Sequence, residues 1–200
     1  MNTCYIIGAM PFGERFSVDG SDLVIAADGG QAALARLGIR PQLVVGDFDS
    51  SEAPTDIPFI RHPVEKDDTD TALAVKEGMR RGYEYFIFYG CTGGRFDHTL
   101  AAIQTLHRLS VEGLHGYLVF EDGTVGTVVV NKSLQLAPKG TVSVFSLTDE
   151  SVGVSIEGLK YPLKDARLTN DFPLGVSNEG DGSLAKISVE RGALLVIFNR

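Results

Sequence analysis

The stretch Leu43-Val44-Val45-Gly46-Asp47-Phe48-Asp49-Ser50 is a short apolar run that ends in glycine and acidic residues. A run of this length, bounded by turn residues, is typical of a buried strand. Two earlier runs, Tyr5–Gly8 and Leu23–Ala27, and a later one, Tyr85–Tyr89, also end at glycine or aspartate, and Gln31–Leu37 has helical spacing. Strands that alternate with helices predict a mostly parallel sheet with flanking helices.

Two longer helices are predicted in the same half of the chain. The segment Asp68–Arg81 has an apolar face, and either Thr69 or Asp68 is placed to cap its N-terminus. The segment Phe96–Leu109 carries a second apolar stripe at helical spacing. Two further strands complete the series, at Pro58–Arg61 and Tyr117–Phe120.

The pattern changes after Glu121-Asp122-Gly123. No good helical spacing follows, and turn residues separate six β-rich segments: Val125–Val130, Leu134–Leu136, Thr141–Leu147, Val152–Ile156, Ala185–Val189 and Ala193–Phe198. We therefore expect two domains: an α/β catalytic domain over residues 1–123, and an all-β domain of sandwich or barrel-like type over residues 124–200.

The composition excludes several classes of protein. With 200 residues, 44% hydrophobic content and a net charge of −8, the chain is typical of a globular protein and unlike a nucleic-acid binder. No apolar run approaches the roughly 20 residues of a membrane span, so no membrane partner is expected. The N-terminus resembles a first strand rather than a signal peptide, which predicts a cytoplasmic protein. The two cysteines, Cys4 and Cys91, are expected to be buried, reduced thiols.

The charge is concentrated in one region. The segment from Asp47 to Asp70 contains eight acidic and two basic residues. It therefore carries −6 of the net charge of −8. In an extended backbone, Asp47 and Asp49 would point the same way. Two adjacent carboxylates repel each other unless a cation lies between them, and Mg²⁺ prefers oxygen ligands of this kind. The alternative is that these acids only shape a turn after the strand.

A second acidic segment, Glu65-Lys66-Asp67-Asp68-Thr69-Asp70-Thr71, leads into the predicted helix. Asp67, Asp70 and Thr71 follow at i, i+3 and i+4, which places them on one face of a first helical turn. Acids are common at helix N-termini as capping and dipole partners, and this is the structural alternative. Three acids within four residues exceed what capping requires, which favours a functional role.

The third segment, Gly90-Cys91-Thr92-Gly93-Gly94-Arg95-Phe96-Asp97-His98, joins a strand to a helix through two glycines. Such a turn lets the backbone approach a phosphate, and Arg95 can bind phosphate oxygens as a fork. The spacing excludes a Walker A loop. His98 is open to three roles: base, phosphate donor or backbone cap. A fourth turn, Asp28-Gly29-Gly30, indicates only that something approaches the backbone closely there.

Taken in order, these motifs resemble the thiamine pyrophosphokinase family. The resemblance rests on Asp28-Gly29-Gly30, Gly46-Asp47-Phe48-Asp49-Ser50, Lys66-Asp67-Asp68-Thr69-Asp70 and Gly93-Gly94-Arg95-Phe96-Asp97-His98. It continues in the second half through Gly158–Leu163 and Gly175–Glu179. It implies an α/β domain followed by a β-sandwich domain, a homodimer with the active site between subunits, and transfer of the pyrophosphoryl group of ATP to thiamine.

The resemblance also implies roles for single residues. Asp47, Asp49 and Asp70 would form the Mg²⁺ and phosphate centre, with Asp67 and Asp68 nearby. Phosphate contacts would come from Lys66, Thr71 and Arg95. The nucleotide site would be shaped by Asp97 and the Gly93-Gly94 turn, with Asp28, Gly29 and His98 beside it. Thiamine would be met by three residues of the second domain: Tyr161, stacking on its rings, and Ser177 and Asn178.

Two other functions remain open at the level of sequence. Asp47-Phe48-Asp49 after an apolar strand is compatible with a phosphatase that uses one aspartate as nucleophile and the other as acid. That reading leaves the Arg95 turn without a role. A non-catalytic sensor of Mg²⁺-nucleotide would also carry these motifs, and only turnover separates a sensor from an enzyme.

Overall fold

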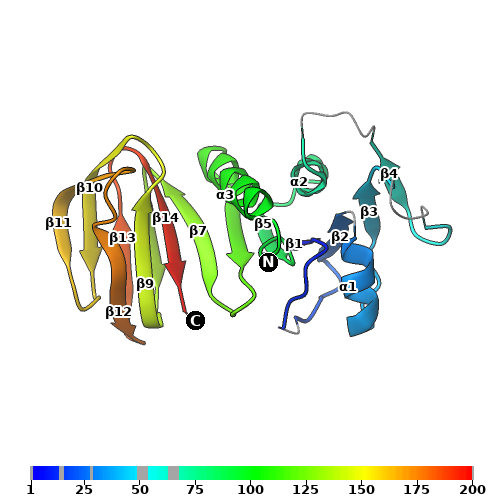
Figure 1. Cartoon of the computed structure of the whole chain (residues 1–200), viewed down its shortest axis with the longest axis horizontal. Coiled ribbons are helices and arrows are strands. Elements are labelled where there is room, and N and C mark those ends of the chain that lie inside the picture. Colours follow the sequence, from blue (N-terminus) through cyan, green and yellow to red (C-terminus); the bar gives the residue numbers. More distant parts are fainter. Residues whose placement is uncertain (1, 14–15, 28, 49–53, 63–67, 200) are drawn as a thin grey trace. The chain divides into compact units, whose positions relative to one another are not determined.

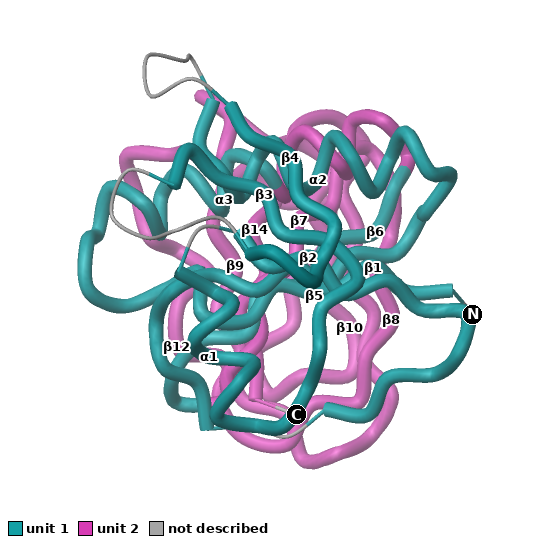
Figure 2. The backbone as a smooth tube through the Cα atoms, turned by 90° about the vertical axis from the view of Figure 1, so that its right-hand side faces the viewer, with its two compact units in different colours: residues 1–105, 114–122 teal, residues 106–113, 123–200 magenta. Residues whose placement is uncertain are grey.

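The computed structural model describes residues 2–13, 16–27, 29–48, 54–62 and 68–199 of the chain. The chain divides into two compact units, drawn in different colours in Figure 2. Unit 1 comprises residues 1–105 and 114–122, and unit 2 comprises residues 106–113 and 123–200. No helix in the described part of the chain is long and apolar enough to cross a membrane.

Unit 1 is built on a parallel sheet. Its strands are β1 (Thr3–Ile7), β2 (Leu23–Ala27), β3 (Leu43–Gly46), β4 (Phe59–Arg61), β5 (Tyr85–Tyr89) and β6 (His115–Val119) (Figure 1). They are ordered β6-β5-β1-β2-β3-β4, and every neighbouring pair runs parallel. All five residues of β2 are buried. This burial explains the continuous apolar run, because helices leave neither face of a central parallel strand in water.

Three helices accompany this sheet. They are α1 (Gly30–Leu37), α2 (Asp70–Arg80) and α3 (Phe96–Val111), whose first ten residues belong to unit 1. Thr69 caps α2: its hydroxyl oxygen accepts a hydrogen bond from the Ala72 amide at 3.1 Å. The predicted cap is therefore confirmed. The helix begins at Asp70, two residues later than the pattern suggested.

Apart from the C-terminal part of α3, unit 2 is built from two sets of antiparallel strands. The first has the order β12-β9-β14-β7, and the second β11-β10-β13-β8. The first sheet contains β7 (Val125–Val130), β9 (Lys139–Ser146), β12 (Gly175–Asp181) and β14 (Ala193–Phe198), and the second β8 (Ser133–Leu136), β10 (Glu150–Glu157), β11 (Leu163–Thr169) and β13 (Ala185–Ser188). One hydrophobic core joins them, with Val144 and Val196 from one sheet against Ile156 and Ile187 from the other.

The coarse fold prediction is confirmed: an α/β half precedes an antiparallel β-rich half, and no described residue from 123 to 199 lies in a helix. Two strands were missed. Both β11 and β12 lie at sheet edges, where only one residue of β11 and two residues of β12 are buried. An edge strand keeps polar residues on exposed positions, so its sequence lacks the apolar alternation that identified the other strands.

Candidate active site

The order of strands in unit 1 contains a switch point. From β1 the chain moves outward through β2, β3 and β4, and it then returns to place β5 on the other side of β1. The loops that follow β1 and β5 therefore leave the sheet side by side and connect in opposite directions. In open parallel sheets, ligands bind in the crevice that forms at this point, beyond the carboxyl ends of the strands.

Glycines hold these two loops together. The Gly8 amide donates a hydrogen bond to the Tyr89 carbonyl at 2.8 Å, and the Met10 amide donates to the Gly90 carbonyl at 3.0 Å. A Cβ atom on Gly8 would lie 2.3 Å from the Gly90 carbonyl oxygen. Gly90 has φ +64°, a conformation that side chains other than glycine rarely adopt. The close contact between the loops thus depends on residues without side chains.

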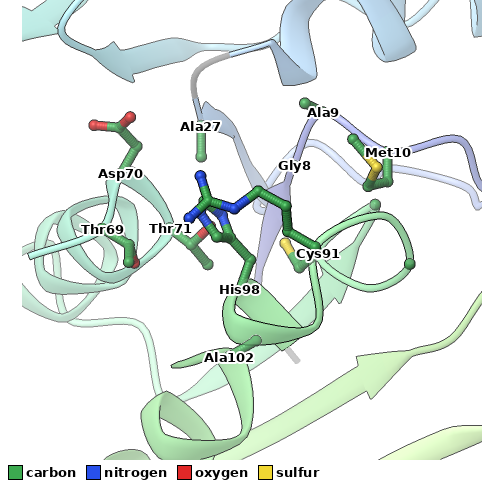
Figure 3. A pocket seen from close by; sticks show the side chains of 13 residues that line it. Gly8, Ala9, Met10, Ala27, Thr69, Asp70, Thr71, Cys91, His98 and Ala102 are labelled. Carbon is green, nitrogen blue, oxygen red and sulfur yellow. The ribbon is translucent and has the colours of Figure 1, made fainter. Parts of the chain in front are cut away.

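A cavity of about 300 Å³ lies beside these loops in unit 1 (Figure 3). Its wall is mostly backbone and small side chains, to which two helix N-termini add polar groups. The lining residues are Gly8, Ala9, Met10, Ala27, Thr69, Asp70, Thr71, Gly90, Cys91, Gly93, Arg95, His98 and Ala102. Figure 3 shows Asp70 and Thr71 on the first turn of α2, across the cavity from Met10.

Five of the residues predicted from sequence line this one cavity: Gly93, Asp70, Thr71, Arg95 and His98. Asp70 and Thr71 come from α2, His98 from the first turn of α3, and Gly93 and Arg95 from the loop between β5 and α3. The backbone amides in the first turn of a helix favour a negatively charged ligand. The combination of two such termini with a guanidinium is suited to an anion with several oxygens, such as a polyphosphate.

Arg95 is paired in this structure. Its Nε and Nη2 atoms donate to the two carboxylate oxygens of Asp97 at 3.1 and 2.5 Å. The hydrogen bonds from Arg95 lower the pKa of Asp97, which therefore stays ionised. Both side chains are exposed. An exposed ion pair exchanges partners at low cost, so a phosphate can take the place of Asp97 on the guanidinium.

Other predicted residues lie outside the described lining of the cavity. Asp68 pairs with Lys76, with 2.6 Å between Oδ2 and Nζ. Gly94 borders a separate hollow beside Phe96 and Phe120. Gly29 precedes α1, where a Cβ atom would lie 2.9 Å from that of Ala9, a lining residue. A side chain at Gly29 would therefore crowd the wall of the cavity, and its predicted place in the nucleotide site stays a prediction.

Asp47 is half-buried directly after β3. The next residue, Phe48, has φ 57°, which is left-handed rather than extended backbone. The expectation of extended backbone through this turn is therefore wrong at Phe48. The rings of Phe48 and Phe59 pack edge to face, with 5.4 Å between their centres. The Arg61 guanidinium carbon lies 5.4 Å from the centre of the Phe48 ring. These contacts hold an unfavourable conformation in place and so fix the direction of the turn that carries Asp47.

Four predicted residues, Asp28, Asp49, Lys66 and Asp67, fall outside the described residues. Among the residues that the structure describes, no group of three or more Asp, Glu, His or Cys side chains is arranged to hold a metal ion. Two of the four predicted metal ligands, Asp47 and Asp70, are described, and both are half-buried.

Sequence reasoning missed part of the cavity wall. Ala9, Met10 and Ala27 carry no chemical signature, and only the strand order places them beside the phosphate-type turn. Cys91 also lines the cavity, and both cysteines are free and buried, as predicted. Burial raises the pKa of the Cys91 thiol to about 12, although a hydrogen bond with the Thr71 side chain acts in the opposite direction. The thiol is therefore protonated at neutral pH and is not a nucleophile.

The three residues predicted to meet thiamine lie together in unit 2. Tyr161 is in the loop between β10 and β11, and its side chain is exposed. Ser177 and Asn178 are in β12. Two hydrogen bonds join the Asn178 side chain to the backbone of Tyr161. The Tyr161 amide donates to Asn178 Oδ1 at 2.9 Å, and Asn178 Nδ2 donates to the Tyr161 carbonyl at 2.7 Å. Ser177 is exposed and has φ 60°.

Comparison with known proteins gives two consecutive family matches. Residues 17–118 match the model of the thiamin pyrophosphokinase catalytic domain, and residues 127–194 match that of the thiamin pyrophosphokinase vitamin B1 binding domain. The chain belongs to the thiamin pyrophosphokinase family. It is therefore an enzyme, a thiamine diphosphokinase, and the predicted family and activity are confirmed.

Individual relatives agree with this assignment. A thiamine pyrophosphokinase of Bacillus subtilis is 28% identical over 191 residues, which cover 90% of this chain and 88% of that protein. A crystal structure of the thiamine pyrophosphokinase from the same species has a TM-score of 0.86 at 25% identity, with 98% of each chain covered. The thiamin pyrophosphokinase of Candida albicans is 14% identical with a TM-score of 0.77, covers 100% of this chain and 89% of its own, and shows the shared fold.

Proposed function

We propose that this enzyme binds the phosphates of Mg²⁺-ATP in the cavity of unit 1 and transfers the pyrophosphoryl group to the hydroxyl of thiamine, giving thiamine diphosphate and AMP. The convergence of Asp70, Thr71 and Arg95 on one cavity at the switch point of the sheet carries this proposal. An aspartate-nucleophile phosphatase leaves the Arg95 turn without a role. A nucleotide sensor would carry the same convergence, so turnover is the observation that separates it from the proposed enzyme.

The phosphates would be held largely by backbone. The first turns of α2 and α3 each contribute amides without helical partners, and each helix terminus is worth about 0.3–1 kcal/mol to a nearby anion. Gly93, at φ 81°, lets the chain approach the ligand without a side chain in the way. Arg95 would leave Asp97 to bind phosphate oxygens as a fork. The Thr71 hydroxyl would donate one further hydrogen bond.

The proposed metal ligands are of the chemical type that magnesium prefers. Asp70 on the cavity wall and Asp47 at the end of β3 offer hard carboxylate oxygens, and Asp49 and Asp67 are the remaining proposed ligands. When bound, Mg²⁺ supplies neutralisation of the phosphate charge, which the surplus of carboxylates in this region would otherwise repel. The acidic region in turn favours thiamine, which carries a permanent positive charge.

The nucleoside part of ATP has a second hollow available. It measures about 520 Å³ and shares Gly93 with the phosphate cavity. Phe96, 79% exposed, and Phe120 offer apolar surface for a base, and Glu121 and Asp122 offer acceptors for ribose hydroxyls. We expect Phe96→Ala to raise the KM for ATP about threefold to tenfold and to leave the KM for thiamine unchanged. Equal changes in both constants would contradict this placement.

The thiamine end of the reaction is assigned to unit 2. Tyr161 presents an exposed ring on which a cationic thiazolium can stack. Ser177 and Asn178 lie in the neighbouring strand β12, and Asn178 bonds to the Tyr161 backbone. We further propose that the chain acts as a cytoplasmic homodimer whose active site includes residues of both subunits. Residues 1–123 would serve as the catalytic domain, and residues 124–200 would bind thiamine and form the dimer.

A turnover assay tests the function directly. Purified protein with ATP, thiamine and Mg²⁺ should release AMP and thiamine diphosphate in equal amounts, and chelation of Mg²⁺ should abolish both. Release of inorganic phosphate with trapping of a phosphoaspartate at Asp47 would indicate the phosphatase instead. Binding of both substrates without AMP formation, over a range of metals and pH, would indicate the sensor.

A further inference from the structure

The side chain of Asn178 is almost entirely engaged with the protein itself. It is 5% exposed. Its Oδ1 atom accepts hydrogen bonds from the amides of Tyr161 at 2.9 Å and Glu179 at 2.8 Å, and its Nδ2 atom donates to the Tyr161 carbonyl at 2.7 Å. A carboxamide has two donor hydrogens and two acceptor lone pairs. Three of these four positions are used, which leaves little capacity for a substrate.

The loop that Asn178 holds is attached to unit 2 in two ways: Leu159 is buried in the hydrophobic core, and residues 160 and 161 form hydrogen bonds with β12. The Tyr161 side chain is 55% exposed, so burial of the ring contributes little to its position. The neighbouring residue, Lys160, makes two contacts with β12: its amide donates to the Glu179 carbonyl at 3.0 Å, and its ammonium pairs with the Glu179 carboxylate at 2.7 Å. Asn178 and Glu179 therefore fix the loop to β12, and the Asn178 side chain bonds to both the amide and the carbonyl of Tyr161.

Lys160 also limits access to the ring. Its ammonium lies 5.3 Å from the centre of the Tyr161 ring, over one face. A cation at this position occupies the electron-rich surface that a cationic ligand requires. Because Glu179 pairs with Lys160, the Lys160 charge repels a positively charged partner on the other face of this exposed ring less strongly.

We infer that Asn178 is a positioning residue that clamps the backbone of Tyr161, so that the exposed ring presents one open face to the cationic heteroaromatic ring of the substrate. This inference rests on the proposed function only for the identity of the ligand. The clamp itself is a property of unit 2 and exists without substrate. The two residues have different roles: Tyr161 contacts the ligand, and Asn178 acts only by positioning Tyr161.

The first test uses a fluorescent reporter. The chain contains no tryptophan, so Tyr161→Trp introduces a single indole at the ring in question. Without any substrate, adding Asn178→Ala to that variant should lower the fluorescence anisotropy of the indole and increase its quenching by acrylamide. Unchanged anisotropy and quenching would overturn the inference, because the clamp would then not hold the ring.

The matched control is Asn170→Ala in the same reporter. Asn170 belongs to the same unit, and its exposed amide donates to Asp149 at 3.4 Å rather than to the Tyr161 loop. It should leave the anisotropy unchanged. If Asn178→Ala fails to fold by circular dichroism, Asn178→Asp replaces it. That variant keeps both acceptor bonds but places a carboxylate oxygen against the Tyr161 carbonyl, and a loss of anisotropy is expected there too.

The second test is kinetic. Asn178→Ala should raise the KM for thiamine on the order of tenfold, as expected for a lost cation–aromatic contact, and should leave the KM for ATP unchanged. Tyr161→Ala should have a similar effect, and the double variant should be no worse than Tyr161→Ala alone. Additive losses would mean that Asn178 binds substrate independently of Tyr161, which would overturn the inference.

Breaking the Lys160–Glu179 ion pair should have a smaller effect on the KM for thiamine, and the direction of the change can be predicted. Glu179→Gln should raise the KM for thiamine about twofold to fivefold at low salt, because the Lys160 charge is then uncompensated. Adding Lys160→Met should remove this increase. If wild-type protein shows no thiamine turnover, the proposed function fails, whereas the anisotropy result in the absence of substrate still decides the clamp.

Discussion

The phosphate cavity of unit 1 and the Tyr161 loop of unit 2 are built by different means. The cavity is formed by strand order, glycine turns and helix termini, so most of its wall is backbone or small side chains. The Tyr161 loop is anchored by Leu159 in the core, and at Tyr161 itself by the side chain of one buried asparagine beside an exposed ion pair. Topology therefore produces the first site, and specific side-chain bonding produces the second.

This difference predicts where each site is vulnerable. A site made of backbone tolerates many side-chain changes but not an added Cβ atom at a close contact. A site held by one amide should fail on loss of that amide and keep its fold. If both sites responded in the same way to these two kinds of substitution, the two sites would be built alike.

The largest effect is expected at Gly90. A Cβ atom there would lie 2.5 Å from the Met10 carbonyl oxygen and 2.8 Å from that of Gly8, at φ +64°. The left-handed conformation costs an alanine about 1–2 kcal/mol, and the clash adds about 1–3 kcal/mol. Gly90→Ala should lower the free energy of unfolding by about 2–5 kcal/mol, measured by urea denaturation, and should reduce ATP binding.

Gly82→Ala is the matched control for this prediction. Gly82 has φ +83°, and nothing lies within 4 Å of a Cβ atom added to it. It should lose only the conformational part, about 1–2 kcal/mol. Equal losses in the two variants would mean that the contact between the β1 and β5 loops contributes nothing.

The next effect is expected at Asp70, the carboxylate on the cavity wall. Asp70→Asn keeps the size of the side chain and removes its charge. We expect turnover to fall at least ~10²-fold, equivalent to about 2.7 kcal/mol of transition-state stabilisation, with an unchanged circular dichroism spectrum.

Asp56→Asn provides the comparison for Asp70, since Asp56 is an exposed acid paired with Arg40 in the same acidic region. It should retain full activity. Near-normal activity of Asp70→Asn would mean that Asp70 is not part of the catalytic centre. The cavity would then act on the phosphates mainly through backbone amides and Arg95.

The same difference between the sites explains what sequence could predict. Leu43–Gly46 and the turn after it were recognisable because a parallel strand buried on both faces is apolar throughout. Asp70, Thr71 and Arg95 could be predicted because charged or hydroxyl side chains directly at the start of a helix are a recognisable sequence pattern. Ala9 and Met10 were not, because they join the cavity only through the strand order.

Unit 2 was less predictable for a physical reason. Asn178 bonds to a residue 17 positions away, and no local pattern encodes that pairing. Its strand, β12, lies at a sheet edge and changes register between Gly175 and Asn178, which breaks the alternation of buried and exposed residues. Ser177 and Asn178 were identified through family resemblance, and their division of roles emerges only from the hydrogen bonds.

The smallest effect concerns the other end of α2. Glu77 is 8% exposed and accepts hydrogen bonds from Arg80 at 2.7 and 2.8 Å and from Arg81 at 2.7 Å. These bonds, Arg80 first, lower the pKa of Glu77 from 4.5 to about 2. Because the folded-state pKa lies below the unfolded value, Glu77 stabilises the fold above pH 4.5 and loses this contribution as the pH falls toward 2.

Glu77→Gln should therefore reduce the free energy of unfolding by about 1 kcal/mol at pH 7 and lose less stability than wild type between pH 4.5 and 2. Urea titrations at several pH values measure both quantities. Glu112→Gln removes an exposed partner of Arg108, 3.1 Å away, and should alter neither. If the two variants behaved alike, the anchoring of α2 would depend on its apolar face alone. The helix terminus at Asp70 would then be positioned by packing rather than by this buried charge.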